Sequence, residues 1–263
     1  MFSITETKFY LPLDDNGFIV NVSSKDHLSS ANMKYVESII NYFLLLHKNY
    51  VHSIYLSGSS ANGRFREGYS DIDLLVVYSD ELQFDNKLKG TISKEFCLNN
   101  PTLPQIDLSQ RNLRNVFARP MDFLIKTQMC CVYGKNLQDQ IPPFKVSEAI
   151  IYNLPLTRKL FDTFQRKILQ ENHPEIIKHL GAQIFKNIIR FSYETIMLEV
   201  KRYTRDIYTC YFELQKYYPE KQQTFYEMLN YSINGITDKA TILNLINSIR
   251  EWLIEKSETN VSL

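Results

Sequence analysis

The sequence has little that would suit an extended polyanionic partner. Lysine and arginine number 30 against 29 aspartate and glutamate residues, the formal charge is +1, and no run of five or more basic residues occurs. A groove that follows a nucleic-acid backbone normally needs a stripe of basic residues, because its phosphate contacts are electrostatic. Nucleic acid is therefore not favoured as the main partner, although a local basic patch is compatible with this balance.

Long apolar runs are missing as well. Aliphatic stretches such as Leu44–Leu46 are far shorter than the roughly 20 residues that a membrane-spanning helix requires. The first ten residues lack the basic-then-apolar pattern of a secretory signal. We therefore expect a cytoplasmic protein with no membrane partner.

Cysteine and histidine are sparse and show no metal-ligand spacing. We interpret the cysteines as reduced core residues and place the adjacent pair in a helix. The cysteines are Cys97, Cys130, Cys131 and Cys210. Four of the five histidines, His27, His47, His52 and His179, receive no functional role, and His173, next to Pro174, is interpreted as a capping or loop residue.

What is present indicates a globular protein with two domains. The chain has 263 residues, of which 44% are hydrophobic and 22% charged, which is ordinary for a folded chain long enough to bury one large or two modest cores. Pro142-Pro143 marks a break. We predict a first domain over residues 1–141 and a second over residues 142–263.

The first domain has alternating strand and helix signals. Apolar spacing predicts a helix from Met33 to about His47. Strands are predicted at 53–57, 71–77 and 103–108, with a short strand at 18–20 and a helix at 86–96. In the strand at 71–77, Ile72, Leu74 and Val76 should face one side of the sheet, with Asp71, Asp73, Leu75 and Val77 on the other.

The second domain has only helical signals, since strand patterns stop at about Met121. The fold class is therefore α+β, with a mixed-sheet domain followed by an all-helical bundle. Apolar residues at helical spacing lie in 160–168, 184–200, 208–214, 225–229 and 242–253, the last after the cap candidates Thr237-Asp238.

Two carboxylates in the first domain point to metal chemistry. Asp71 and Asp73 are two residues apart on a predicted strand, so their side chains should share a face and could share divalent cations. Aspartate and Mg²⁺ are a hard–hard match, and enzymes of nucleoside triphosphates hold Mg²⁺ with a few carboxylates and phosphate oxygens. Asp107, beside another predicted strand, is the candidate for a third ligand in a two-metal site.

A small-residue turn precedes these carboxylates. Gly58-Ser59 follows the strand at 53–57 and leads into a short helix. Glycine would let the backbone approach a phosphate closely, and Ser59 would donate a hydrogen bond to it. A lone glycine–serine turn or a lone Asp-x-Asp is common on protein surfaces, so the joint pattern carries the prediction.

Gly58-Ser59, eleven intervening residues, and Asp71-Ile72-Asp73 together resemble the signature of the polymerase β-type nucleotidyltransferases. The resemblance covers about residues 51–109. It implies a nucleoside triphosphate substrate, with Mg²⁺ bound by Asp71, Asp73 and Asp107. Relatives often carry arginine after the turn, where this chain has Ala61-Asn62-Gly63 followed by Arg64 and Arg66. Gly58, Ser59, Arg64 and Ser70 are the nucleotide-binding candidates of this domain.

The second half more weakly resembles the helical domain of aminoglycoside adenylyltransferases of the streptomycin and spectinomycin type. The stretches that carry this resemblance are 126–137 and 203–219. In such enzymes a cation before one helix reaches the nucleotide phosphates, and Arg205 occupies the matching place. A surface role for Arg205 is the alternative. Acidic residues such as Glu194 and Glu213 could attract a cationic acceptor or could be solvated helix residues.

These features favour an enzyme that transfers a nucleoside monophosphate, with AMP from ATP as the expected donor, to a hydroxyl of a small molecule such as an aminoglycoside. Catalytic roles would fall to Asp71, Asp73 and Asp107. The alternative is an antitoxin-like or regulatory protein of the same fold that acts on, or docks to, a protein or tRNA. Minimal proteins of that kind are usually short, whereas this chain carries its own helical domain.

Overall fold

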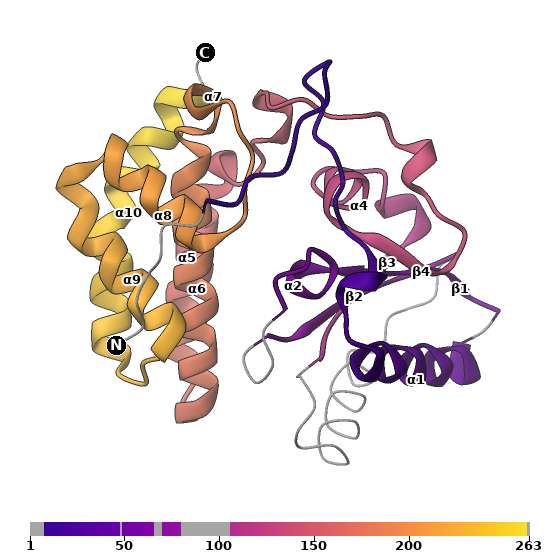
Figure 1. Ribbon diagram of the computed structural model, residues 1–263. Helices are drawn as coiled ribbons and strands as arrows, with labels where there is room; N and C mark the ends of the chain where they lie inside the picture. Colours follow the sequence, from indigo (N-terminus) through magenta and orange to yellow (C-terminus); the bar gives the residue numbers. More distant parts are fainter. Residues whose placement is uncertain (1–7, 48, 66–69, 80–105, 262–263) are drawn as a thin grey trace. The chain divides into compact units, whose positions relative to one another are not determined.

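The computed structural model describes residues 8–47, 49–65, 70–79 and 106–261. The described chain divides into two units (Figure 1), each treated separately below. Residues 12–145 form the sheet unit, and residues 8–11 with residues 146–261 form the helical unit. The chain therefore passes between the units twice, after Leu11 and after Lys145.

The sheet unit is built on a mixed four-stranded sheet with the order β3-β2-β1-β4. The strands are β1 (Val51–Ser57), β2 (Ile72–Tyr78), β3 (Ile106–Asn112) and β4 (Cys130–Gly134). β1 pairs antiparallel with both β2 and β4, whereas β2 pairs parallel with β3. The predicted strand at 18–20 is reduced to isolated bridges from Phe18 and Ile19. The predicted helix at 86–96 and the start of the predicted strand at 103–108 lie outside the described residues.

Two predictions about the segment after Met121 are wrong. Strands do not stop there, because β4 follows, and Cys130-Cys131 opens that strand rather than lying in a helix. β4 is a short edge strand, and Cys130 to Tyr133 are all half-buried. Because successive residues do not alternate between buried and exposed positions, the sequence of β4 lacks a clear alternation of apolar and polar residues. Cys130, Cys131 and Cys210 carry free thiols, and Cys97 lies outside the described residues.

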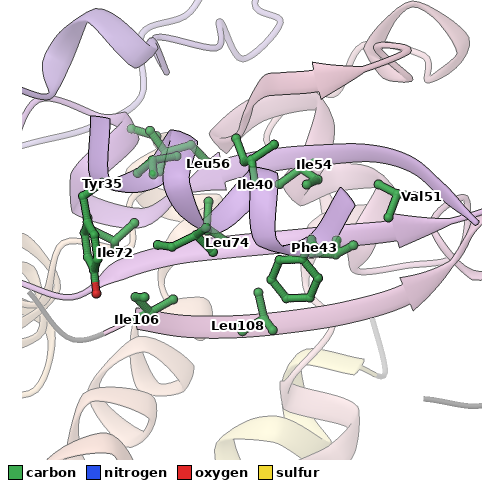
Figure 2. Close-up of a cluster of buried hydrophobic side chains, with 14 of the residues drawn as sticks. Tyr35, Ile40, Phe43, Val51, Ile54, Leu56, Ile72, Leu74, Ile106 and Leu108 are labelled. Carbon is green, nitrogen blue, oxygen red and sulfur yellow. The ribbon is translucent and has the colours of Figure 1, made fainter. Parts of the chain in front are cut away.

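One face of the sheet is covered by α1 (Ser30–His47), which begins three residues before its predicted start. Apolar residues of α1 at helical spacing, such as Ile39 and Phe43, are fully buried. They belong to one cluster with alternating strand residues, including Ile72, Leu74 and Ile106 (Figure 2). The predicted orientation of Ile72, Leu74 and Val76 toward a single core is confirmed.

Among the described residues, the opposite face is buried toward the carboxyl end of β2. Leu75 and Val77 are buried there, and Figure 1 shows α4 (Met121–Gln128) on the side of the sheet away from α1. The Tyr55 hydroxyl accepts a hydrogen bond from the Leu137 amide at 2.7 Å, which fixes the chain after β4 to this face. Asp73, earlier on β2, is only half-buried.

Short helical segments complete the sheet unit. They are η1 (Lys25–His27), α2 (Gly58–Ala61), η2 (Leu113–Asn115) and η3 (Gln138–Gln140). Of these, η1 and α2 lie beside the candidate site.

The remaining described chain is almost entirely helical. Its α-helices are α5 (Thr157–Gln170), α6 (Pro174–Glu194), α7 (Met197–Val200), α8 (Ile207–Tyr217), α9 (Gln222–Asn234) and α10 (Lys239–Val261). Short segments are η4 (Glu148–Ile150), η5 (Leu154–Leu156) and η6 (Pro219–Lys221). Each predicted helical pattern falls within these elements, except that 184–200 is divided between α6 and α7. Asp238 accepts from the Thr241 amide at 2.9 Å, as its capping role predicts. No helix in the described ranges is long and apolar enough to cross a membrane.

The N-terminal segment of the helical unit binds the loop before α8. The Leu11 amide donates to the Tyr203 carbonyl at 2.9 Å, and the Thr204 hydroxyl donates to the Phe9 carbonyl at 2.5 Å. The Tyr10 hydroxyl donates to Glu213 at 2.7 Å. Glu213 also pairs with lysine side chains and is buried, so it is not a solvated helix residue.

Glu194, at the end of α6, is buried as well. It accepts hydrogen bonds from the backbone amides of Asn153, at 3.1 Å, and Leu154, at 3.2 Å, and thus holds the start of η5. Burial raises its pKa to about 7, although the hydrogen bonds from Asn153 and Leu154 and the charge of Arg205 oppose this shift. The folded protein therefore holds this proton more tightly than an exposed glutamate would.

Glu194 should make stability depend on pH. A raised folded-state pKa contributes stability that is fully present below about pH 4.5 and is lost as the pH rises through about 7. Glu194→Gln stays neutral, so its free energy of unfolding relative to wild type should rise by about 2–3 kcal/mol over this interval. Urea titrations at both ends of the interval measure this change. The exposed Glu199→Gln is the control, and an equal pH dependence in all three proteins would contradict the assignment.

Candidate active site

The pairing of β2 with β3 aligns two of the predicted carboxylates. Asp73 is the register partner of Asp107, as Ile72 is of Ile106. Register partners in a parallel pair lie on the same face, and neighbouring residues alternate between faces. Since Ile72 and Ile106 belong to the core under α1, Asp73 and Asp107 lie side by side on the opposite face. Both are half-buried.

Asp71 immediately precedes β2 and is also half-buried. Among the described residues, no three His, Cys, Asp or Glu side chains are gathered as a preassembled metal site. Mg²⁺ does not require such a cage, because it is usually held by one or two carboxylates with water and substrate phosphates. The aligned pair Asp73 and Asp107 fits that incomplete, oxygen-only type of site.

Gly58 leaves the space that the Asp73 side chain occupies. β1 ends at Ser57, the register partner of Asp73, and the chain then turns into α2. A Cβ atom on Gly58 would overlap the Asp73 carboxylate oxygen Oδ2 and lie 2.9 Å from Cγ. Gly58 also has a φ of +67°, which other residues rarely adopt. Both the backbone conformation and the lack of space therefore require glycine at position 58, and the turn backbone lies directly against the carboxylate.

Local hydrogen bonds fix the shape of this turn. The Ser60 hydroxyl donates to the Ser57 carbonyl at 2.7 Å, and the Arg64 amide donates to the Ser59 carbonyl at 3.1 Å. Ser59 is half-buried beside the exposed Gly58. The backbone of the turn at Gly58 thus lies against Asp73, and Ser59 is the next residue along the chain.

Arg64 and Ser70 flank a short gap in the described chain. Arg64 follows the turn, Ser70 adjoins Asp71, and both are half-buried. Arg66 lies outside the described residues. In the sequence, Arg64 is therefore close to the turn, and Ser70 is close to the carboxylates.

Arg205 belongs to the helical unit, just before α8. Its Nη1 donates to the Tyr152 hydroxyl at 2.8 Å, and its carbonyl accepts from Arg190 Nε at 2.9 Å. Burial alone would lower the pKa of Arg205, but Tyr152, Tyr203 and Glu194 outweigh it and raise the pKa above its ordinary value. Its guanidinium is thus charged and held by a tyrosine.

His27 received no role from the sequence, yet it contacts this turn. Its Nδ1 lies 2.6 Å from the carbonyl oxygen of Ala61, the last residue of α2. The contact joins residues 34 positions apart, so no local sequence motif could predict it.

Comparison with known proteins gives a family for part of the chain and a fold for most of it. Residues 36–152 match the family model described as a nucleotidyltransferase domain. The crystal structure of spectinomycin adenyltransferase AAD(9) from Enterococcus faecialis, with ATP and spectinomycin, is similar at a TM-score of 0.56 and 14% identity. That similarity covers 88% of this chain and 100% of the other. No curated protein sequence matches the chain.

Toxin–antitoxin structures are weaker matches. One, with AMP-PNP, is 21% identical and covers 50% of this chain and 94% of its own, at a TM-score of 0.29. Another is the tri-AMPylated HEPN toxin with MNT antitoxin from Shewanella oneidensis, 19% identical over 50% of this chain and 94% of its own, at a TM-score of 0.24. These TM-scores carry no argument about this chain. Residues 36–152 thus match the nucleotidyltransferase domain model, and the two-part fold is shared with a solved structure.

The close approach of Gly58 to Asp73 has a measurable cost. Gly17 provides a matched control, since it has a φ of +79° and nothing within 4 Å of an added Cβ. Gly17→Ala should lower the free energy of unfolding by about 1–2 kcal/mol through backbone strain alone. Gly58→Ala should cost clearly more, and the excess should disappear in an Asp73→Ala background. Equal costs for both glycines, or an excess that persists without Asp73, would contradict the packing described here.

Proposed function

We propose that this protein transfers a nucleoside monophosphate, AMP from ATP, to a hydroxyl of a small molecule, with aminoglycosides as the first acceptor class to test. The alignment of Asp73 with Asp107, together with the Asp73 carboxylate lying against Gly58, carries this proposal. It joins a carboxylate pair to an exposed glycine turn. A pair that could hold a metal and a turn that could hold phosphate are the two parts such a transfer needs.

Asp71, Asp73 and Asp107 would hold Mg²⁺, which when bound would neutralise charge on the triphosphate and the transferred group. The turn at Gly58 would let the backbone approach the phosphates, and Ser59 would donate a hydrogen bond to them. Arg64, Ser70 and Arg205 are further proposed nucleotide-binding residues. Their positive or hydroxyl groups suit phosphate oxygens.

In the transfer, the acceptor oxygen would form a bond to the α-phosphorus while the bond to pyrophosphate breaks. The acceptor hydroxyl must lose its proton, and Asp107 is the proposed base because it is a half-buried carboxylate next to Asp73. Positioning of the acceptor supplies much of the rate in such reactions. We propose that the helical unit binds the acceptor.

The choice of acceptor class rests on one comparison. The spectinomycin adenyltransferase named above shares the two-part fold, and its structure contains ATP and spectinomycin. At 14% identity the shared fold does not transfer the substrate, so a panel must test it. Wild-type transfer to a protein or tRNA instead would favour the regulatory alternative.

Nucleotide binding should depend on Asp73. MgATP well above its Kd should raise the Tm of the wild-type protein by a few degrees, because a ligand that binds only the folded state stabilises it. Asp73→Asn removes charge with little change in volume and should abolish most of this shift. Asp122→Asn is the control, since its carboxylate pairs with Arg119 instead. The same ligand-induced shift in all three proteins would refute the metal assignment.

Asp107 should separate binding from transfer. With labelled ATP, Mg²⁺ and a panel of aminoglycosides, nucleotides and tRNA, the wild-type protein should form a labelled small-molecule product. Asp107→Asn should abolish transfer while keeping appreciable ATP binding, because Asp71 and Asp73 remain. Asp139→Asn, in η3, is a matched control. Transfer by Asp107→Asn at the wild-type rate would remove Asp107 from the mechanism.

A further inference from the structure

The end of α2 is held by an element that contains none of the proposed catalytic residues. The Ala61 carbonyl accepts hydrogen bonds from the Ser24 amide at 2.8 Å and from His27 Nδ1 at 2.6 Å. Ala61 is fully buried, whereas the His27 side chain is largely exposed. Because the partner is a carbonyl oxygen, Nδ1 must carry the proton and donate. An exposed ring thus reaches inward to a buried backbone group.

This contact matters because α2 has only four residues. The last carbonyls of a helix have no partner within the helix, so other groups must satisfy and fix them. At the other end, the Ser60 hydroxyl donates to the Ser57 carbonyl. His27 and Ser24 therefore fix the far end of the segment that begins with Gly58 and Ser59.

The same ring also lies beside the chain as it leaves the turn. Gly63 has a φ of +76°, and a Cβ added to it would lie 3.4 Å from His27 Cδ2. The next residue is Arg64, whose amide donates to the Ser59 carbonyl. His27 thus contacts the turn at Ala61 and borders it at Gly63.

A purely local role in η1 does not account for this arrangement. The Ser24 side chain accepts from the Asp26 amide at 3.1 Å, and the Leu28 amide donates to the Lys25 carbonyl at 3.2 Å. These bonds define η1 without the imidazole. The His27 ring is directed at α2.

We propose that His27 is a positioning residue that holds the Gly58–Ser59 turn in the shape that receives the triphosphate. This rests on the proposed function. His27 acts through the Ala61 carbonyl and touches neither nucleotide nor acceptor. Its loss should weaken ATP binding in the ground state and transition state alike, which raises KM for ATP and leaves kcat nearly unchanged.

The test compares substitutions that keep or remove the donor. His27→Phe keeps a ring but cannot donate, and His27→Ala removes the ring entirely. His27→Asn retains an N–H donor near the position of Nδ1. The control is His179→Phe, because His179 is an exposed histidine of α6 whose ring lies 2.9 Å from the side chain of Gln183, one turn along the same helix.

Titration calorimetry with MgATP should show binding roughly 3- to 10-fold weaker in His27→Phe and His27→Ala, the range expected for one lost hydrogen bond. His27→Asn and the control should stay within about 2-fold of wild type. Amide hydrogen exchange without nucleotide should be faster at Asn62 and Arg64 in the first two variants only. This second readout requires no ligand and detects release of the turn directly.

The possible outcomes separate the positioning role of His27 from the proposed function. Wild-type ATP affinity in His27→Phe and His27→Ala overturns the positioning role, whatever the exchange rates, while leaving the proposed function intact. Weaker binding in His27→Asn as well, equal to that of His27→Phe, overturns the role of the donor. A wild-type protein that binds no MgATP overturns the proposed function and with it the role of His27.

Discussion

The parallel pairing of β2 with β3 is the constraint on which the candidate site depends. It gives Asp73 and Asp107 neighbouring positions because Ile72 and Ile106, one residue earlier on each strand, are buried in the core under α1. A slip of one residue in either strand would turn a carboxylate into that core and an isoleucine out of it. The hydrophobic core therefore sets the register, and the register brings the carboxylates together.

Packing and hydrogen bonds fix the conformation of the turn beside this pair of carboxylates. Gly58 admits the Asp73 carboxylate because it has no side chain, and the turn it begins is tied at Ser57 and at Ala61. Groups that meet a multiply charged ligand gain from such rigidity, because less conformational entropy is lost on binding. The proposed metal ligands and the groups that hold the turn thus come from separate parts of the sheet unit.

The strands and helices with strong local periodicity could be predicted from the sequence. The alternation in β2 oriented Asp73 correctly, and the helical patterns of the second half lie in helices, except that 184–200 is divided between α6 and α7. Features made by long-range pairing could not be predicted. β4 is half-buried at an edge, residues 8–11 bind the loop before α8, and His27 acts on a carbonyl 34 residues away. The burial of Glu194 also depends on tertiary packing, because its hydrogen-bond partners lie near residue 153.

The central claim is that Asp73 and Asp107 jointly bind the cation that accompanies the nucleotide. Crystals grown with Mn²⁺ and a non-hydrolysable ATP analogue would test it directly through the anomalous signal of manganese. The account predicts a peak about 2.0–2.3 Å from carboxylate oxygens of both residues and from phosphate oxygens. Bound nucleotide with its manganese at other side chains, or with neither aspartate among the ligands, would contradict it.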